Sequence, residues 1–134
     1  MIKNCGAGWA HIKIGDFEGS ASYLRSTPEE LLLAFLHFYE EGIGSVYFDE
    51  EGSSFILTLS ADCYDTFVIE RREEERLHII DISAEDIVKE GYEDIKKDVE
   101  GWAEWSCTSD EKEEYEEHLA NLEIILGRLK EYVN

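Results

Sequence analysis

Hydrophobic and polar residues alternate in the N-terminal part of the chain and then change to a helical period. Residues 9–14 alternate and are rich in β-forming side chains, and residues 20–25 follow a glycine-containing turn. This pattern predicts a β-hairpin. Residues 27–30 read Thr-Pro-Glu-Glu, which is a capping box with proline in the first helical position. Hydrophobic residues then recur at helical spacing up to Gly42, so we expect one amphipathic helix that ends there.

The middle of the chain has a hydrophobic period of two, which is typical of β-strands. The segments with this period are residues 46–48, 55–59, 66–71 and 77–82. Short polar segments connect them, and short connections favour antiparallel neighbours. We therefore expect these strands to form a meander.

From residue 83 to its end the chain has the helical period again. One stripe of hydrophobic positions runs along residues 88–102, and a second runs along residues 115–133. Thr108 and Glu111 repeat the spacing of a capping box between the two stripes. Two such stripes joined by a short corner predict an antiparallel helical hairpin at the C-terminus.

The elements follow one another in the order β-β-α-β-β-β-β-α-α, which predicts an α+β fold. We expect an antiparallel sheet with the helices packed on one face and the helical hairpin at the C-terminal end. The length of 134 residues corresponds to one domain, and a hydrophobic fraction of 43% is enough to build its core. Residues 1–134 are therefore expected to form a single domain.

Acidic residues outnumber basic ones throughout the chain. The sequence contains 32 Asp and Glu against 12 Lys and Arg, which gives a formal net charge of −20. Residues 1–82 and residues 83–134 each hold 16 acidic and 6 basic side chains, so the charge does not come from an acidic tail. Nucleic acids and anionic membrane surfaces repel such a protein, and we expect neither as a partner. The excess of carboxylates favours rapid association with a basic protein, and solubility is its other explanation.

Three acidic clusters and one tryptophan are the candidates for partner binding. Two clusters lie in predicted turns between strands and the third lies at the start of the last helix: Asp49, Glu50 and Glu51; Glu73, Glu74 and Glu75; and Asp110, Glu111, Glu113, Glu114, Glu116 and Glu117. Trp105 is close to the third cluster, and a large aromatic side chain beside carboxylates is typical of an interface hot spot. For the acidic turns the alternative is protection against edge-to-edge aggregation, and for Trp105 with Trp102 it is packing in the core.

The sequence lacks the motifs of common cofactor and metal sites. It has no phosphate-binding glycine loop, no Cys-x-x-Cys pair and no His-x-x-x-His pair, so we expect no cofactor and no metal. A carboxylate pair combined with His37, His78 or His118 is the residue set for an alternative, a small carboxylate- or metal-dependent hydrolase.

The cysteines and the N-terminus indicate a cellular compartment. Cys5, Cys63 and Cys107 are odd in number and far apart, so they do not predict a disulfide framework. The N-terminus has no apolar segment of the kind found in signal peptides, and no apolar run approaches the length of a membrane span. These features predict a cytoplasmic protein with free thiols and no membrane segment.

The N-terminal stretch WAHIKIGDFEGSASYL, the leucine-rich helix after it and the Tyr-Phe-Asp-Glu end of the next strand resemble small bacterial proteins of unassigned function. In size, acidity and α+β make-up, the chain also resembles the cytoplasmic immunity proteins of bacterial toxin systems. Those proteins often neutralise a basic nuclease toxin by covering its active cleft. The resemblance implies a non-enzymatic, acidic toxin inhibitor with a basic protein partner. The alternatives are the hydrolase and a regulatory adaptor that acts through the C-terminal helices.

Overall fold

The computed structural model describes residues 1–61 and 66–133, so Cys63 lies outside the described residues. Within them the chain forms two antiparallel sheets and four helices, which confirms an α+β fold. The strands are β1 (Ile2–Gly6), β2 (Trp9–Ile14), β3 (Phe17–Ser22), β4 (Ile43–Asp49), β5 (Ser54–Ser60), β6 (Thr66–Arg71) and β7 (Glu75–Ile80). The helices are α1 (Thr27–Glu41), α2 (Ala84–Lys96), α3 (Val99–Trp105) and α4 (Lys112–Val133). The observed order, β-β-β-α-β-β-β-β-α-α-α, has one strand and one helix more than the predicted order.

The strands β1, β2 and β3 form a sheet of their own instead of joining one larger sheet. The strand predicted at residues 9–14 is confirmed as β2. The sequence did not reveal β1, because only Ile2 of this strand is buried and its other residues are exposed. The strand predicted at residues 20–25 begins earlier, at Phe17, because Ile14 pairs with Phe17 across a tight turn at Gly15.

The strands β4, β5, β6 and β7 form the second sheet as an antiparallel meander, in the predicted order. One face of this sheet, the inner face, packs into the core with Val46, Phe48, Phe55, Leu57, Leu59 and Val68. Phe17 of β3 contacts Phe55 edge to face, with ring centroids 4.9 Å apart. A side chain on Gly19 of β3 would meet the same ring at 2.4 Å, so the two sheets share one closely packed core.

The helix α1 lies across the inner face of the four-stranded sheet, and the predicted helix is confirmed. Its backbone approaches β4 so closely that a side chain on Gly44 would meet the carbonyl oxygen of Ala34 at 1.9 Å. Gly42 follows the helix in the left-handed conformation, with a φ of 86°. The predicted capping box is not formed, because the carboxylate of Glu30 binds Arg25 at 2.6 Å and not the start of the helix.

The C-terminal region forms three helices instead of the predicted hairpin of two. Asp98 separates α2 from α3, because its carboxylate accepts a hydrogen bond from the N–H of Gly101 at 3.2 Å and caps α3. The helix α4 then packs against α1 and α3. The capping box expected from Thr108 and Glu111 is also not formed, since the Thr108 hydroxyl binds the carboxylate of Glu114 at 2.9 Å.

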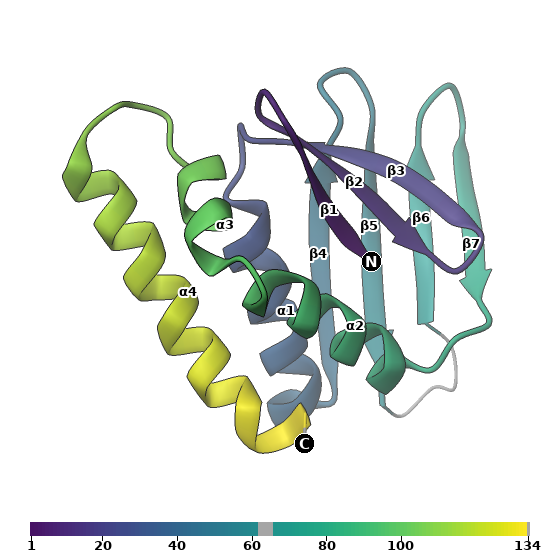
Figure 1. Ribbon diagram of the computed structural model, residues 1–134. Coiled ribbons are helices and arrows are strands. Elements are labelled where there is room, and N and C mark those ends of the chain that lie inside the picture. The colour runs from purple at the N-terminus through teal and green to yellow at the C-terminus, as the bar shows by residue number, and fades with distance from the viewer. Residues whose placement is uncertain (62–65, 134) are drawn as a thin grey trace.

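Figure 1 shows how these elements form layers. The three-stranded sheet crosses in front of the four-stranded sheet, α1 and α2 lie on the same side of it, and α4 is the outermost helix. The opposite face of the four-stranded sheet, the outer face, carries no described helix or strand. None of the described helices is both long enough and apolar enough to cross a membrane.

Candidate functional site

Two of the predicted acidic clusters lie side by side at one end of the four-stranded sheet. The first cluster (residues 49–51) runs from the end of β4 into the β4–β5 turn, and the second cluster (residues 73–75) runs from the β6–β7 turn into the start of β7. The strand register connects the two turns through one row of facing residues: Asp49, Ser54, Arg71 and Glu75. Figure 1 shows both turns at the upper end of the sheet, and we call this end the acidic end.

Arg72 ties the first cluster to both sheets. Its guanidinium donates to the carboxylate of Glu50 at 3.1 Å and to the main-chain oxygen of Glu18 at 3.0 Å. Glu50 also accepts hydrogen bonds from the N–H of Ser20 at 3.1 Å and the hydroxyl of Ser53 at 3.0 Å. Burial alone would raise the pKa of Glu50, but these hydrogen bonds and the charge of Arg72 outweigh burial and lower it. Glu50 is therefore committed to holding the two sheets together.

The other carboxylates of the acidic end divide into paired and unpaired ones. Glu74 and Glu75 form exposed ion pairs with neighbouring arginines, at 3.2 and 3.4 Å. Asp49 accepts a hydrogen bond from the N–H of Glu51 at 2.7 Å and so shapes the turn. The carboxylates of Glu51 and Glu73 have no basic partner within residues 1–61 and 66–133. Glu51 and Glu73 are therefore the carboxylates of this end that are free to meet a partner.

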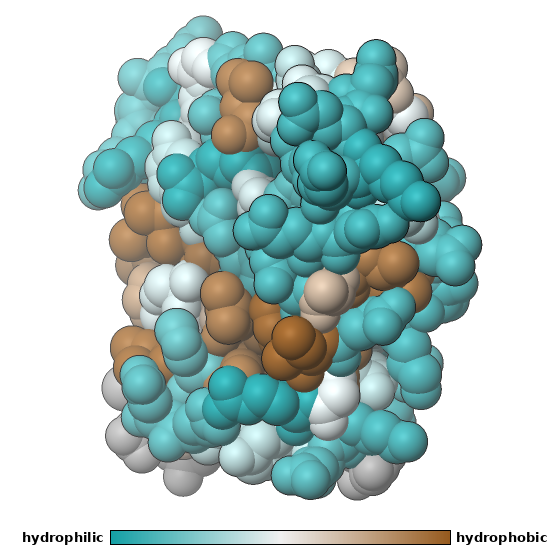
Figure 2. All heavy atoms as spheres, turned by 90° about the vertical axis from the view of Figure 1, so that its left-hand side faces the viewer, coloured by the Kyte–Doolittle hydropathy of each residue, from teal (hydrophilic) through white to brown (hydrophobic). Residues whose placement is uncertain are grey.

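The third cluster (residues 110–117) lies at the start of α4, away from the sheet. Its exposed side chains are Asp110, Glu111, Glu113, Glu116 and Glu117. Glu114 differs from them, because hydrogen bonds from the backbone and hydroxyl of Thr108 and from the N–H of Ser109 lower its pKa. Figure 2 shows hydrophilic side chains over most of the upper part of this side of the molecule. The structure thus joins the first and second clusters and leaves the third on a separate side.

Trp105 is not the exposed anchor that was expected beside the third cluster. It is only 7% exposed, and its indole N–H donates to the main-chain oxygen of Trp9 at 3.1 Å. Its ring also contacts Trp102 edge to face, with centroids 5.6 Å apart. The pair belongs to the core, where α3 packs against the three-stranded sheet. We therefore leave Trp105 out of the binding surface.

The outer face of the four-stranded sheet carries hydrophobic side chains in two rows across the strands. The first row is Tyr47, Ile56, Ile69 and Leu77, and the second row has Phe67 and Ile79 beside Ser45 and Thr58, whose hydroxyls bind each other at 2.9 Å. We call the hydrophobic members of both rows the apolar rows. Leu77 is 61% exposed and Ile79 is 59% exposed. The first row lies next to the row that contains Asp49 and Glu75, so the acidic end borders the apolar rows. An apolar centre with a charged border is the usual anatomy of a protein–protein interface.

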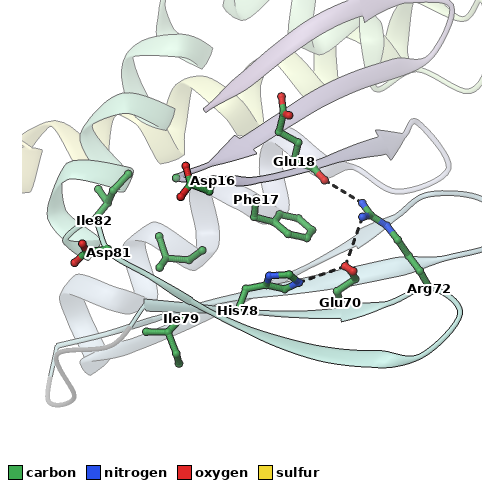
Figure 3. Close-up of a pocket in the computed structure, with 11 residues that line it drawn as sticks. Asp16, Phe17, Glu18, Glu70, Arg72, His78, Ile79, Asp81 and Ile82 are labelled. Carbon is green, nitrogen blue, oxygen red and sulfur yellow. Dashed lines mark hydrogen bonds and ion pairs between the residues drawn. The ribbon is translucent and has the colours of Figure 1, made fainter.

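A cleft of about 500 Å³ opens along the inner side of β7, beside the β2–β3 turn. Glu70, His78 and Arg72 form its polar end, as Figure 3 shows. Nε2 of His78 lies 3.3 Å from the carboxylate of Glu70, and the guanidinium of Arg72 lies 3.5 Å from the same carboxylate. The ring of Phe17 packs over this group, with its centroid 5.1 Å from that of His78. Asp16, Asp81 and Ile82 lie at the opposite end of the cleft.

The three histidines considered for a hydrolase lie on three different elements. His37 is exposed on α1, and His118 of α4 binds Glu29 of α1 at 2.5 Å, which joins these two helices. His78 has Glu70 beside it, and among the described residues no Ser, Thr or Cys lines the same cleft. In the part of the chain that the structure describes, no group of three or more His, Cys, Asp or Glu residues is placed to hold a metal ion.

Comparisons of this chain with protein-family models, with curated proteins and with solved structures find no match. The candidate surface therefore rests on the chain's own residues: the two apolar rows of the outer face together with Glu51 and Glu73. The sequence reasoning missed the apolar rows. Their signal is that residues 55–57 and 67–69 are hydrophobic at consecutive positions, which is typical of strands that are apolar on both faces.

Proposed function

We propose that this protein is a non-enzymatic binding protein that recognises a basic protein through the candidate surface. One observation supports the proposal most. The outer face of the four-stranded sheet carries the apolar rows, no described helix or strand covers it, and it is bordered by Glu51 and Glu73, which have no basic partner within the described residues. The apolar rows provide area that loses its water on binding, and the carboxylates select a positively charged partner.

The most specific form of this proposal is an immunity protein that acts in the cytoplasm of a bacterium. Its partner is then a cationic toxin, such as a nuclease, whose active cleft it covers. A cleft that binds phosphate groups needs Lys and Arg side chains, and exposed carboxylates can pair with the same side chains. The chain would thus inhibit by occupying the substrate's place and not by chemistry of its own.

The net charge of −20 supports rapid association with such a partner. The field of the whole molecule includes the third cluster, even though that cluster lies on another side. Because salt screens this field, the association rate is expected to fall at least about tenfold between low salt and several hundred millimolar salt. An association rate that does not change with salt contradicts the proposed steering.

The adaptor alternative requires an exposed hydrophobic stripe on the C-terminal helices. Both predicted stripes are instead largely buried within this chain: Val88, Tyr92, Ile95, Trp102, Leu122, Leu126 and Leu129. These helices use their apolar sides for the core, so the proposal rests on the sheet.

Affinity capture from the native host tests the function. The baits are the unchanged protein, a Glu51→Gln/Glu73→Gln variant, and a Glu113→Gln/Glu117→Gln variant that removes the same charge from α4. We expect the unchanged protein and the α4 variant to capture one basic protein, identified by mass spectrometry. The Glu51→Gln/Glu73→Gln variant should bind that protein, once purified, at least about tenfold more weakly, as two lost charge-assisted contacts imply.

Two outcomes contradict the proposal. If the two variants bind the purified partner equally, the acidic end is not part of the interface. If the unchanged protein captures no basic protein whose binding is weakened by either pair of substitutions, the proposed function is wrong. Growth of host cells that express the partner alone or with this protein then tests the inhibitor role directly.

A further inference from the structure

The strand β7 is the last strand of the four-stranded sheet, and its free edge is open. It pairs with β6 alone, through six consecutive residue pairs from Glu75 to Ile80 without a bulge. Within the described residues, β7 makes no backbone hydrogen bond other than those to β6. The remaining N–H and C=O groups of β7 therefore point away from the sheet, where a further strand can pair with them.

The second part of this edge, residues 77–80, lacks the features that usually protect an edge strand. The charged side chains of β7, Glu75 and Arg76, lie at its first two positions, whereas residues 77–80 read Leu-His-Ile-Ile with no proline, glycine or lysine, and Leu77 and Ile79 are both exposed on the outer face. The strand β1, at an edge of the other sheet, shows the usual protection. It carries the exposed Lys3 and its pairing is irregular between Asn4 and Gly6. Residues 77–80 of β7 therefore remain accessible to a further strand.

The cleft lies on the inner side of the same edge. Its lining includes His78 and Ile80 of β7, and the β2–β3 turn closes its far side. Asp16 and Asp81 also line it, and neither carboxylate has a hydrogen-bond or ion-pair partner among the described residues. The one arginine of the lining, Arg72, is already bound to carboxylates and to a main-chain oxygen. The cleft therefore has unbalanced negative charge and room for a long basic side chain.

We propose that β7 binds an extended segment of the basic partner as a fifth strand of this sheet. Successive side chains of a strand point to opposite faces. The outward-pointing side chains of the added strand lie next to Leu77 and Ile79 and continue the apolar rows. Those that point inward are Lys or Arg, and they enter the cleft beside Asp16 and Asp81. This inference rests on the proposed function only for the basic nature of the partner.

Charge favours such a partner over a second copy of this chain. Pairing of β7 with β7 of another copy would bring together two molecules that each carry a net charge of −20. It would also place the second cluster of one copy close to the acidic side chains of the other. Like charges at that distance oppose association, whereas an alternating apolar and basic strand satisfies both the outer face and the cleft.

Synthetic peptides test strand addition without the natural partner. The probe is a short peptide that alternates Val and Lys, and two further versions carry N-methyl groups on one or the other set of alternate backbone amides. We expect the unmodified peptide to slow amide hydrogen exchange within residues 77–80 and to bind. One N-methylated version should bind at least about tenfold more weakly, because it loses the amides that pair with β7, whereas the other should bind normally.

Two protein variants complete the test. Asp16→Asn/Asp81→Asn should weaken binding of the unmodified peptide about tenfold, and Glu85→Gln/Asp86→Asn on α2 is the control with equal charge change. Equal binding of all three peptides overturns strand addition in favour of charge alone. Strand addition is also overturned if about 1 mM peptide does not slow amide hydrogen exchange in β7. It is overturned as well if the protein sediments as a dimer and the Ile79→Lys variant sediments as a monomer. The proposed function fails separately, through equal binding of the Glu51→Gln/Glu73→Gln and Glu113→Gln/Glu117→Gln variants to the captured protein.

Discussion

The two faces of the four-stranded sheet are built from the same strands and both carry hydrophobic side chains, but among the described elements only those on the inner face cover the sheet. On the inner face Phe55, Leu57 and Val68 are fully buried under α1 and the three-stranded sheet. On the outer face Leu77 and Ile79 lie exposed, in rows that cross the strands. An antiparallel sheet with one wet face normally alternates between hydrophobic and polar residues. The outer face departs from this pattern.

The difference separates what holds the fold from what is available to a partner. Apolar side chains of the inner face contribute to stability because folding removes them from water. Exposed side chains of the outer face gain little from folding of this chain alone, since they keep most of their contact with water. Substitutions on the inner face should therefore lower stability, and substitutions on the outer face should weaken binding.

Phe55→Ala is expected to give the largest loss of stability. Phe55 is fully buried, stacks on Phe48 with ring centroids 4.6 Å apart, and meets Phe17 edge to face. Removing the ring leaves a cavity between the two sheets, so the free energy of unfolding should fall by about 3–5 kcal/mol. Urea denaturation followed by tryptophan fluorescence measures it. A loss below about 1 kcal/mol would mean that the two sheets do not share this core.

Glu50→Gln should produce an intermediate effect that depends on pH. The pKa of Glu50 is lowered in the folded protein, so its contribution is complete above the ordinary value of 4.5 and is lost as pH falls through the folded pKa. Near neutral pH the variant should be less stable by about 1–2 kcal/mol, because charge-assisted hydrogen bonds become neutral ones. Below pH 4.5 the difference should shrink.

Glu51→Gln is the matched control, since this exposed carboxylate of the same turn has no basic partner in the described part of the chain. Its unfolding free energy should differ from that of the unchanged protein by less than about 0.5 kcal/mol at every pH. If the unfolding free energies of Glu50→Gln and Glu51→Gln depend on pH in the same way, the hydrogen bonds between Arg72 and Glu50 do not hold the two sheets together.

Local signals in the sequence predicted the elements whose structure depends on neighbouring residues. The helix that ends at Gly42 and the four strands of the meander were predicted correctly because hydrophobic period, turns and a C-terminal glycine are local properties. The strand β1 was missed because its pairing with β2, and not its own pattern, makes it a strand. The helical hairpin was wrong because Asp98 caps a new helix inside an otherwise continuous stripe.

The sequence predicted only the charged residues of the candidate site. The acidic turns were recognised from composition, but their meeting at one end of the sheet depends on the strand register. Trp105 was misplaced because its hydrogen-bond acceptor, the oxygen of Trp9, is 96 residues away in the chain. The apolar outer face was not identified because periodicity does not show which side of a strand other elements cover.

The smallest effect on stability is expected from Leu77→Ser. This substitution tests most directly whether the outer face serves binding and not folding. Leu77 is 61% exposed, so the free energy of unfolding should change by less than about 0.5 kcal/mol. Binding to the captured basic protein should nevertheless weaken at least about tenfold, because the row that it ends loses its exposed apolar side chain. Ile124→Ser on α4 is the control, since Ile124 is 63% exposed but lies away from the sheet. Calorimetric titration with the partner and urea denaturation measure both variants. If Leu77→Ser lowers stability by about 2 kcal/mol or more, or if both variants weaken binding equally, the outer face serves the fold and is no separate binding surface.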